Sequence, residues 1–268
     1  MKRFFLWLIS LFVKKVTTKV EETFPEPVVP PCSLVPDFRR KMAARRPKPI
    51  KPKPTPTEPT EPTPIPTEPT PTEPTPTSPT TTGNMLYFNF TGRQVQYSSW
   101  NGGQSFNCAA STLVQADRDQ ALYAAQYAYA PWNIIVTASQ AQFDAHTGPK
   151  QEVIVTPSSS WYPNTSYSGV AHIGSFGRAG DVAFVFEDRL GFRWDFVGDI
   201  MIHESGHTFG LYHQSQYDPN CVLVASYRSG CHMGYPFNLD AQWVTGTSYS
   251  CTAIQNDNAI LDSKLGRK

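Results

Sequence analysis

The eleven residues from His203 to His213 hold three histidines and one carboxylate at a spacing suited to binding a metal ion. They read His-Glu-Ser-Gly-His-Thr-Phe-Gly-Leu-Tyr-His. Residues i and i+4 of a helix project from nearly the same face, about 6 Å apart along the axis, so His203 and His207 can reach one ion. Gly210 permits the left-handed conformation that ends a helix, and the turned chain then brings in His213. The spacing therefore predicts a zinc site with three histidine ligands.

Glu204 directly follows the first predicted ligand and is the candidate catalytic base. Three neutral imidazoles leave a zinc ion its full charge and one open position for water, whose proton a neighbouring carboxylate accepts. The alternative is a helix with two surface histidines and a glycine cap. Given the abundance of His, Glu and Gly in this chain, the five fixed residues arise by chance with a probability on the order of 10⁻⁵.

The pattern His-Glu-x-x-His-x-x-Gly-x-x-His resembles the signature of the metzincin metallopeptidases, which are zinc-dependent endopeptidases. The resemblance implies a methionine turn beneath the zinc, and Met233, in Cys-His-Met-Gly-Tyr, is the candidate. Further segments resemble secreted bacterial reprolysin-like or matrixin-like peptidases, so that the likeness covers about Met85 to Leu261. These segments are Leu86–Phe90, Val170–Phe176, Ala183–Phe186 and Gln242–Trp243.

The residues around the motif do not agree on one metzincin subfamily. Gln214 follows the third histidine, where Asp, Ser, Glu or Pro is more typical. Cys231-x-Met233 is similar to the reprolysin pattern, whereas Met233-x-Tyr235 is similar to the astacin and serralysin pattern, in which the tyrosine binds the metal. Tyr235 is therefore either a fifth ligand that also stabilises the oxyanion, or part of the wall of a specificity pocket. No subfamily is assigned.

Other chemistry-bearing side chains receive weaker interpretations. Because the zinc already has three nitrogens, His146, His172 and His232 are expected not to be ligands. An acidic cluster precedes the predicted active-site helix and is a candidate Ca²⁺ site. It lacks the alternating spacing of a known calcium loop, so solvated charges are the favoured interpretation. Its members are Asp181, Glu187, Asp188, Asp195 and Asp199.

The elements that must position the site follow from local patterns. Asp117 to Ala130 is the first expected helix, ended by Pro131, and the second runs from about Val197 to Phe209. Gly169 to Phe176 is expected to be an edge strand. Further strands are expected at 85–90, 133–138, 151–156 and 181–186. The fold class is therefore α/β (α+β). The resemblance implies a metzincin-like zincin domain, with a twisted mixed sheet, an active-site helix and an irregular C-terminal subdomain.

Composition divides the 268 residues into regions. Fourteen of the 25 prolines lie between Pro47 and Pro79, in a stretch too polar to fold. The net charge of +1 gives no reason to expect nucleic acid or an anionic membrane as a partner. We expect a signal peptide or N-terminal anchor at 1–20, a basic pro-like segment at 21–46, a disordered Pro/Thr-rich stalk at 47–82 and the zinc metallopeptidase domain at 83–268.

The N-terminus favours export. Met1-Lys2-Arg3 and the apolar run Phe4–Val13 are typical of a secretory signal, and ten helical residues rise about 15 Å, half of a bilayer core. No small-x-small cleavage site follows, so the segment can also be an uncleaved membrane anchor. In that case it is the only part of the chain expected to contact a membrane. The protein is therefore expected to be secreted or tethered at the cell surface.

Cysteine usage also fits an oxidising compartment. Cys108, Cys221, Cys231 and Cys251 form an even set that suits two disulfides. Cys221–Cys231 with Cys108–Cys251 is the favoured pairing because the first closes a short loop. The run around Cys32 resembles the latency segment of matrixin zymogens, whose thiolate occupies the open zinc position. An intermolecular disulfide and a thiol removed by processing are the alternatives for Cys32.

The expected function is a zinc-dependent endopeptidase acting on proteins or peptides. The substrate would run antiparallel to the edge strand Gly169–Phe176, and a pocket between the active-site helix and Tyr235–Phe237 would select side chains. The alternative is a catalytically silent, zinc-stabilised surface interaction module. The intact Glu204 argues against it, because a structural zinc site has no need of that carboxylate.

Overall fold

The computed structural model describes residues 20–22, 82–96, 100–162, 166–235, 237 and 241–268. The signal or anchor, Cys32 and almost all of the pro-like segment and stalk lie outside the described residues, so those expectations stay predictions. Within the described part, the fold is a mixed α/β arrangement with a central sheet, four α-helices and three small two-stranded sheets.

The central sheet has the strand order β1-β7-β8-β6-β2-β5. Strands β5, β2, β6 and β8 are mutually parallel, whereas β7 is antiparallel to β8, and β1 is antiparallel to β7. Their bounds are β1 Val20–Glu22, β2 Asn84–Asn89, β5 Ile134–Thr137, β6 Lys150–Thr156, β7 Gly169–His172 and β8 Val182–Phe186. All the strands predicted for this sheet are confirmed, with ends shifted by at most one residue, except that β7 stops four residues before Phe176. The expectation that this segment is an edge strand is wrong, because β1 pairs with its outer side.

Both faces of the sheet are covered, which explains the nearly continuous apolar runs of its strands. Along β8, Ala183 and Val185 join the core beneath the helices, while the alternate residues Val182, Phe184 and Phe186 join a second core. The second core lies under the hairpin of β3 (Arg93–Val95) and β4 (Phe106–Cys108).

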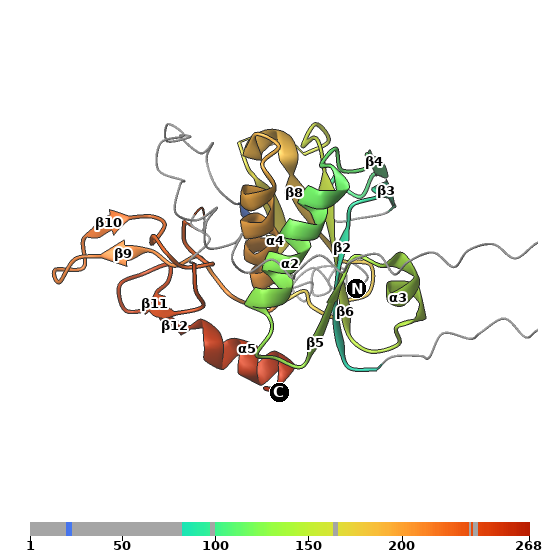
Figure 1. Cartoon of the computed structure of the whole chain (residues 1–268). Helices are drawn as coiled ribbons and strands as arrows, with labels where there is room; N and C mark the ends of the chain where they lie inside the picture. The colour runs from blue at the N-terminus through green and yellow to red at the C-terminus, as the bar shows by residue number, and fades with distance from the viewer. Residues whose placement is uncertain (1–19, 23–81, 97–99, 163–165, 236, 238–240) are drawn as a thin grey trace, which may run out of the picture. The chain divides into compact units, whose positions relative to one another are not determined.

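Four helices complete the described domain, and Figure 1 shows α2 and α4 side by side against the sheet. The helices are α2 Gln115–Ala128, α3 Gln140–Ala145, α4 Trp194–Thr208 and α5 Asp257–Leu265. The two predicted helices, α2 and α4, are confirmed, each beginning two or three residues early. A Cβ at Gly198 of α4 would lie 3.3 Å from Ala121 Cα of α2, so a glycine is what permits this close packing.

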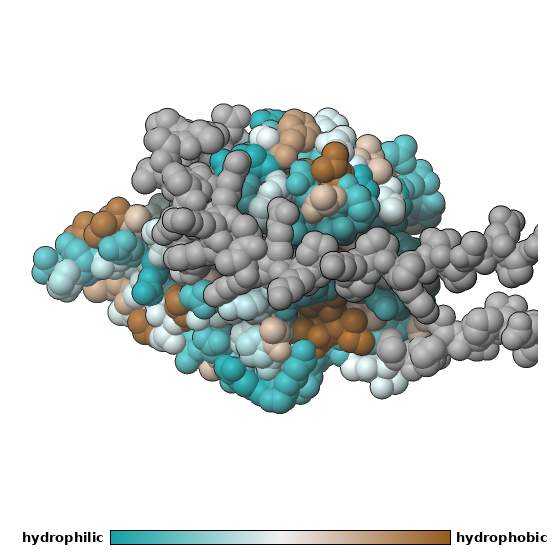
Figure 2. Space-filling model, viewed as in Figure 1, coloured by the Kyte–Doolittle hydropathy of each residue, from teal (hydrophilic) through white to brown (hydrophobic). Residues whose placement is uncertain are grey.

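The C-terminal region, expected to be irregular, consists of short paired strands and the helix α5. Strand β9 (Gln216–Tyr217) pairs with β10 (Leu223–Ala225), and β11 (Thr245–Thr247) pairs with β12 (Ile254–Asn256). These hairpins lie to one side of α4, at the left of Figure 1. Three consecutive apolar residues, Val222 to Val224, are exposed on the β9–β10 hairpin, where Figure 2 shows a brown patch.

The favoured disulfide pairing is wrong. The structure joins Cys221 to Cys251, whereas Cys108 and Cys231 are free and buried. The loop-length argument failed because Cys231 faces the interior, where its Sγ lies 3.4 Å from the carbonyl oxygen of Arg228. Cys221 and Cys251 instead connect two neighbouring hairpins. Burial raises the pKa of both free thiols to about 12, so they stay protonated at neutral pH.

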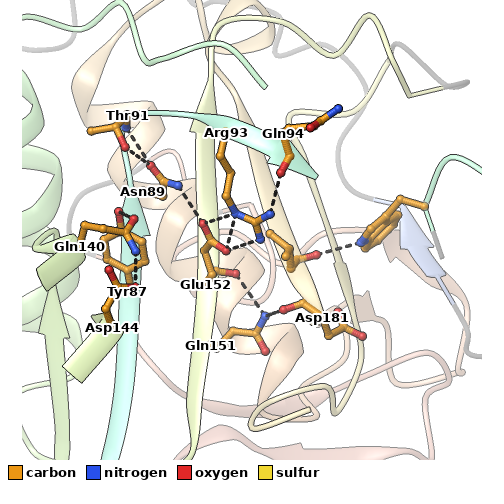
Figure 3. Close-up of polar contacts among 12 residues, drawn as sticks. Tyr87, Asn89, Thr91, Arg93, Gln94, Gln140, Asp144, Gln151, Glu152 and Asp181 are labelled. Atoms are coloured by element: carbon orange, nitrogen blue, oxygen red, sulfur yellow. Dashed lines mark hydrogen bonds and ion pairs between the residues drawn. The ribbon is translucent and has the colours of Figure 1, made fainter. Parts of the chain in front are cut away.

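Figure 3 shows a polar network that fastens the β3–β4 hairpin to the sheet. The buried Glu152 of β6 accepts hydrogen bonds from the guanidinium of Arg93, at 2.6 to 3.0 Å, and from Nδ2 of Asn89, at 2.8 Å. Asn89 lies in an Asn-Phe-Thr glycosylation sequon, but its amide is buried and already paired. A glycan at this position is therefore incompatible with the fold.

Candidate metal centre

Helix α4 presents the first two histidines, and a glycine turn brings in the third. Most of α4 is buried, because it packs on the sheet and on α2, so the rings of His203 and His207 lie inside the protein. The helix ends at Thr208, and Gly210 has a φ of 101°, which confirms the left-handed turn expected there. His213 follows this turn and faces the other two rings.

The three Nε2 atoms form a nearly equilateral triangle, with each pair 3.1 Å apart. Among the described residues, these histidines are the one group of three or more metal-ligating side chains that converge. The centre of such a triangle lies about 1.8 Å from each nitrogen, so an ion at the usual zinc–nitrogen distance of about 2.0–2.1 Å fits slightly to one side.

The hydrogen bonds on the far side of the rings decide which nitrogens face the centre. Nδ1 of His203 lies 2.6 Å from the carbonyl oxygen of His232, and Nδ1 of His207 lies 2.7 Å from that of Leu211. A carbonyl only accepts, so each Nδ1 carries the proton, and each Nε2 presents a lone pair. Lone pairs held this close repel one another, and a cation between them removes the repulsion.

The electrostatics of the site keep all three rings neutral. Burial lowers the pKa of His207 to about 4. Burial also lowers the pKa of His203 and of His213 well below 6.5, and in both cases the neighbouring His207 lowers it further. Because neutral imidazole is the form that binds a metal, the site is prepared for an ion at neutral pH.

Met233 lies against the part of α4 that carries His203 and His207, and its assignment as the methionine turn stays a prediction. A Cβ at Gly206 would lie 2.5 Å from Met233 Sδ and 3.3 Å from the ring of Trp243, so only glycine fits between the two helix ligands. The backbone N–H of Gln214 donates to the carbonyl oxygen of Met233 at 2.6 Å. The methionine segment is thereby joined to the residue that follows the third ligand.

The support of His213 was not recognised in the sequence. The side chain of Gln214 donates to Asp257 at 2.8 Å and to the carbonyl oxygen of Val244 at 3.1 Å. Ser248 donates to the carbonyl oxygen of His213 at 3.1 Å, and the Tyr227 ring lies edge-on to the His213 ring with centroids 5.0 Å apart. These partners come from segments 14 to 43 residues away, so no local pattern reveals them.

Glu204 is fully buried and lies where strand β7 begins. A Cβ at Gly169 would come within 2.7 Å of both Cγ and Oε1 of Glu204, so the carboxylate lies directly against this strand. Beyond β7, the N–H of Gly174 donates to His207 O and the N–H of Phe176 donates to Thr208 O, each at 2.9 Å. The segment from Gly169 to Phe176 therefore runs beside the ligand-bearing part of α4.

The ring of Tyr235 packs against Phe237, with centroids 5.0 Å apart, and both rings lie against the main core. Burial raises its pKa above the usual value for tyrosine. The fifth-ligand and the pocket-wall interpretations of Tyr235 both stay predictions.

The other histidines lie in separate environments. The ring of His232 packs on Trp243, and burial lowers its pKa to about 3. His172 pairs with Asp181 at 3.1 Å and stacks on Trp100. His146 lies 3.0 Å from the carbonyl oxygen of Gly83.

The acidic cluster does not converge on one point within the described structure. Glu187 accepts hydrogen bonds from Ser111 and Thr112, and Asp195 pairs with Arg193. Asp199 is buried inside α4, where desolvation and, secondarily, Asp195 raise its pKa well above the usual value. Among the described residues these carboxylates do not converge as a group of metal-ligating side chains, so the calcium hypothesis gains no support.

Comparison of the sequence with models of known protein families and with characterised proteins finds no match. What the fold and the site do show is a mixed α/β domain in which three histidines, two buried and one half-buried, resemble a zinc site and could hold a metal ion.

Proposed function

We propose that this chain is a zinc-dependent endopeptidase of the metzincin type, acting on extended segments of proteins or peptides outside the cell or at its surface. The observation that carries the proposal is the triangle of three Nε2 atoms, with Glu204 directly after His203 in the chain and its carboxylate against the start of β7. The Cys221–Cys251 disulfide is compatible with an extracellular protein. No helix among the described residues is long and apolar enough to cross a membrane.

The residues divide the work of hydrolysis among them. His203, His207 and His213 would hold the ion. When bound, zinc supplies Lewis acidity, which polarises a carbonyl group and makes water more acidic. Glu204 accepts the proton of the attacking water at its carboxylate and passes it to the leaving amine. Burial of Glu204 strengthens the interaction of its carboxylate with nearby charges, because little water screens that interaction.

Strand β7 supports the choice of an extended polypeptide as the substrate. A peptide that pairs with a sheet edge is bound through its backbone, so binding does not depend on its sequence. The outer edge of β7 runs past Glu204, which would bring a paired peptide bond close to the carboxylate. Tyr235 and Phe237 are the candidate residues for side-chain selection.

The test is hydrolysis of an unstructured protein such as denatured casein by the zinc-loaded full chain. We expect activity that a chelator abolishes and added zinc restores. Glu204→Ala should keep its zinc but lose at least about 100-fold in kcat/KM, the scale expected for a general base. Asp119→Asn, which removes an exposed carboxylate from α2, is the matched control and should keep parental activity.

Two results would contradict the proposal. Equal turnover by Glu204→Ala and the parent would exclude Glu204 as the base. Zinc-loaded, folded protein without hydrolysis would instead favour the zinc-stabilised interaction module.

A further inference from the structure

The outer edge of β7 is paired with a strand from far along the chain. Val20 pairs with His172, Glu21 with Ala171 and Glu22 with Val170, in antiparallel register. The other edge of β7 pairs with β8, where Gly169 lies opposite Val185. An unpaired edge would present free backbone donors and acceptors to any extended chain. In this structure, β1 fills that edge.

The outer edge of β7 lies beside the candidate metal centre. Gly169, one residue before the partner of Glu22, lies directly against the Glu204 carboxylate. The continuation of β7 is hydrogen-bonded to the end of α4 through Gly174 and Phe176. A strand on β7 therefore lies along the metal centre, and β1 takes the antiparallel direction expected for a substrate.

We propose that the outer edge of β7 is a binding surface for one extended strand, and that the chain's own Val20–Glu22 occupies it in competition with peptide substrates. The inference rests on the proposed function, because it names the regulation of that same site. A strand edge pairs with one partner at a time, so a substrate must displace β1.

Two properties make the chain's own segment a suitable occupant. It is covalently tethered, so its local concentration stays high at any protein concentration. It is also only three residues long, so its pairing is weak enough to reverse and is lost when the segment is removed. Occupancy therefore lowers activity without abolishing it.

The experiment breaks the pairing in the full chain with V20P/E21P. Backbone N–H groups of successive residues in a strand point to opposite sides, so two adjacent prolines remove at least one donor to β7 in either arrangement. T60P/E61P is the matched control, because it introduces the same residues and removes the same charge elsewhere in the chain.

The first measurement is amide hydrogen exchange of Gly169–Ile173 in a Glu204→Gln background, which prevents self-cleavage. We expect exchange of those amides in this segment that face β1 to become at least about tenfold faster in V20P/E21P and to stay unchanged in T60P/E61P. The second is kcat/KM of zinc-loaded chains that carry Glu204, with intact mass confirming that the segment is still attached. We expect at least about a tenfold rise, because the competent fraction increases.

The two measurements separate failure of this inference from failure of the proposed function. Unchanged exchange of Gly169–Ile173 in V20P/E21P would overturn the inference, whatever the activity. Faster exchange with equal kcat/KM in an active protein would also overturn it, because the segment would then not compete with substrate. If no variant hydrolyses peptides, the proposed function fails, and faster exchange in V20P/E21P alone would still support β7 as an occupied strand-binding surface.

Discussion

The two site histidines on α4 and the third histidine beyond it are held by different means. His203 and His207 belong to a helix that is buried between the sheet and α2, and their rings donate to backbone carbonyls. His213 lies in the C-terminal region of short hairpins, where polar contacts through Gln214, Ser248 and Asp257 position its backbone. Apolar burial therefore fixes the helix half of the site, which consists of His203 and His207. A hydrogen-bond network fixes the hairpin half, which consists of His213 and the residues that support it.

This difference implies that stability and metal binding depend on the two halves unequally. A change in the helix half disturbs the main core as well as the site. A change in the hairpin half should affect the site with less effect on the core.

The largest effect is expected from removal of a ligand. His203→Ala and His213→Ala should each weaken zinc binding by about 10³-fold, because one of three ligands accounts for about 4 kcal/mol of a typical binding energy. Their metal-free forms should differ. His203→Ala leaves a cavity and an unpaired carbonyl at His232, and should lower the free energy of unfolding by about 2 kcal/mol or more. His213→Ala should lower it by less than about 1 kcal/mol.

Chelator competition gives the zinc affinities, and urea unfolding of the metal-free full chain gives the stabilities. Equal losses of stability in the two variants would show that the halves are not held differently. Parental zinc affinity in His213→Ala would mean that another residue is the third ligand.

The sequence predicts the helix half of the site well, because its information is local. The i, i+4 histidines, Glu204 and the left-handed glycine all lie within eight residues, and helical geometry is sufficient to place them. The resemblance also pointed to Met233, which lies against Gly206 of α4. Apolar runs of strand length likewise located β2, β5, β6 and β8.

The hairpin half depends on contacts between distant residues, which no local pattern encodes. Gln214 meets Asp257 across 43 positions, and Cys221 meets Cys251 across 30. The pairing of β1 with β7 involves only three residues with no distinctive composition. Helix α5 did have a local signal, the capping Asn256 and the terminal Gly266, which was overlooked.

A smaller effect concerns the pH dependence of stability in the hairpin half. Desolvation raises the pKa of Asp257 from 3.8 to about 6, despite hydrogen bonds from Val244, Gln255 and Gln214. The folded protein therefore binds this proton more tightly than the unfolded chain does. The contribution of this protonation to the free energy of unfolding is fully present below about pH 4 and is lost as the pH rises to about 6. The change is at most about 3 kcal/mol.

The buried His207, in the helix half, has the opposite effect on how the free energy of unfolding depends on pH. Its pKa is lowered to about 4, so stability is lost as the pH falls below about 6.5. The informative quantity is therefore the difference in unfolding free energy between the parent and Asp257→Asn, in metal-free chains from pH 4 to 7. The parent should lose stability relative to the variant as the pH rises. A constant difference would exclude Asp257 as the titrating group.

The smallest effect tests the junction between the two halves. A Cβ at Gly210 would have no atom within 4 Å, so Gly210→Ala costs only the strain of placing alanine at a φ of 101°, about 1 to 2 kcal/mol. Gly102→Ala is a matched control, because Gly102 also has a positive φ, of 59°, and equally open surroundings. Both variants should lose similar stability in urea unfolding.

Only Gly210→Ala should also weaken zinc binding, by about tenfold, because relaxing the strained turn moves His213 relative to the helix ligands. The network through Gln214 and Asp257 opposes that movement, so the loss of affinity measures how much the turn contributes beyond the network. If Gly210→Ala binds zinc as tightly as Gly102→Ala, the turn merely permits the geometry. The hydrogen bonds of the hairpin half would then hold the third ligand in place by themselves.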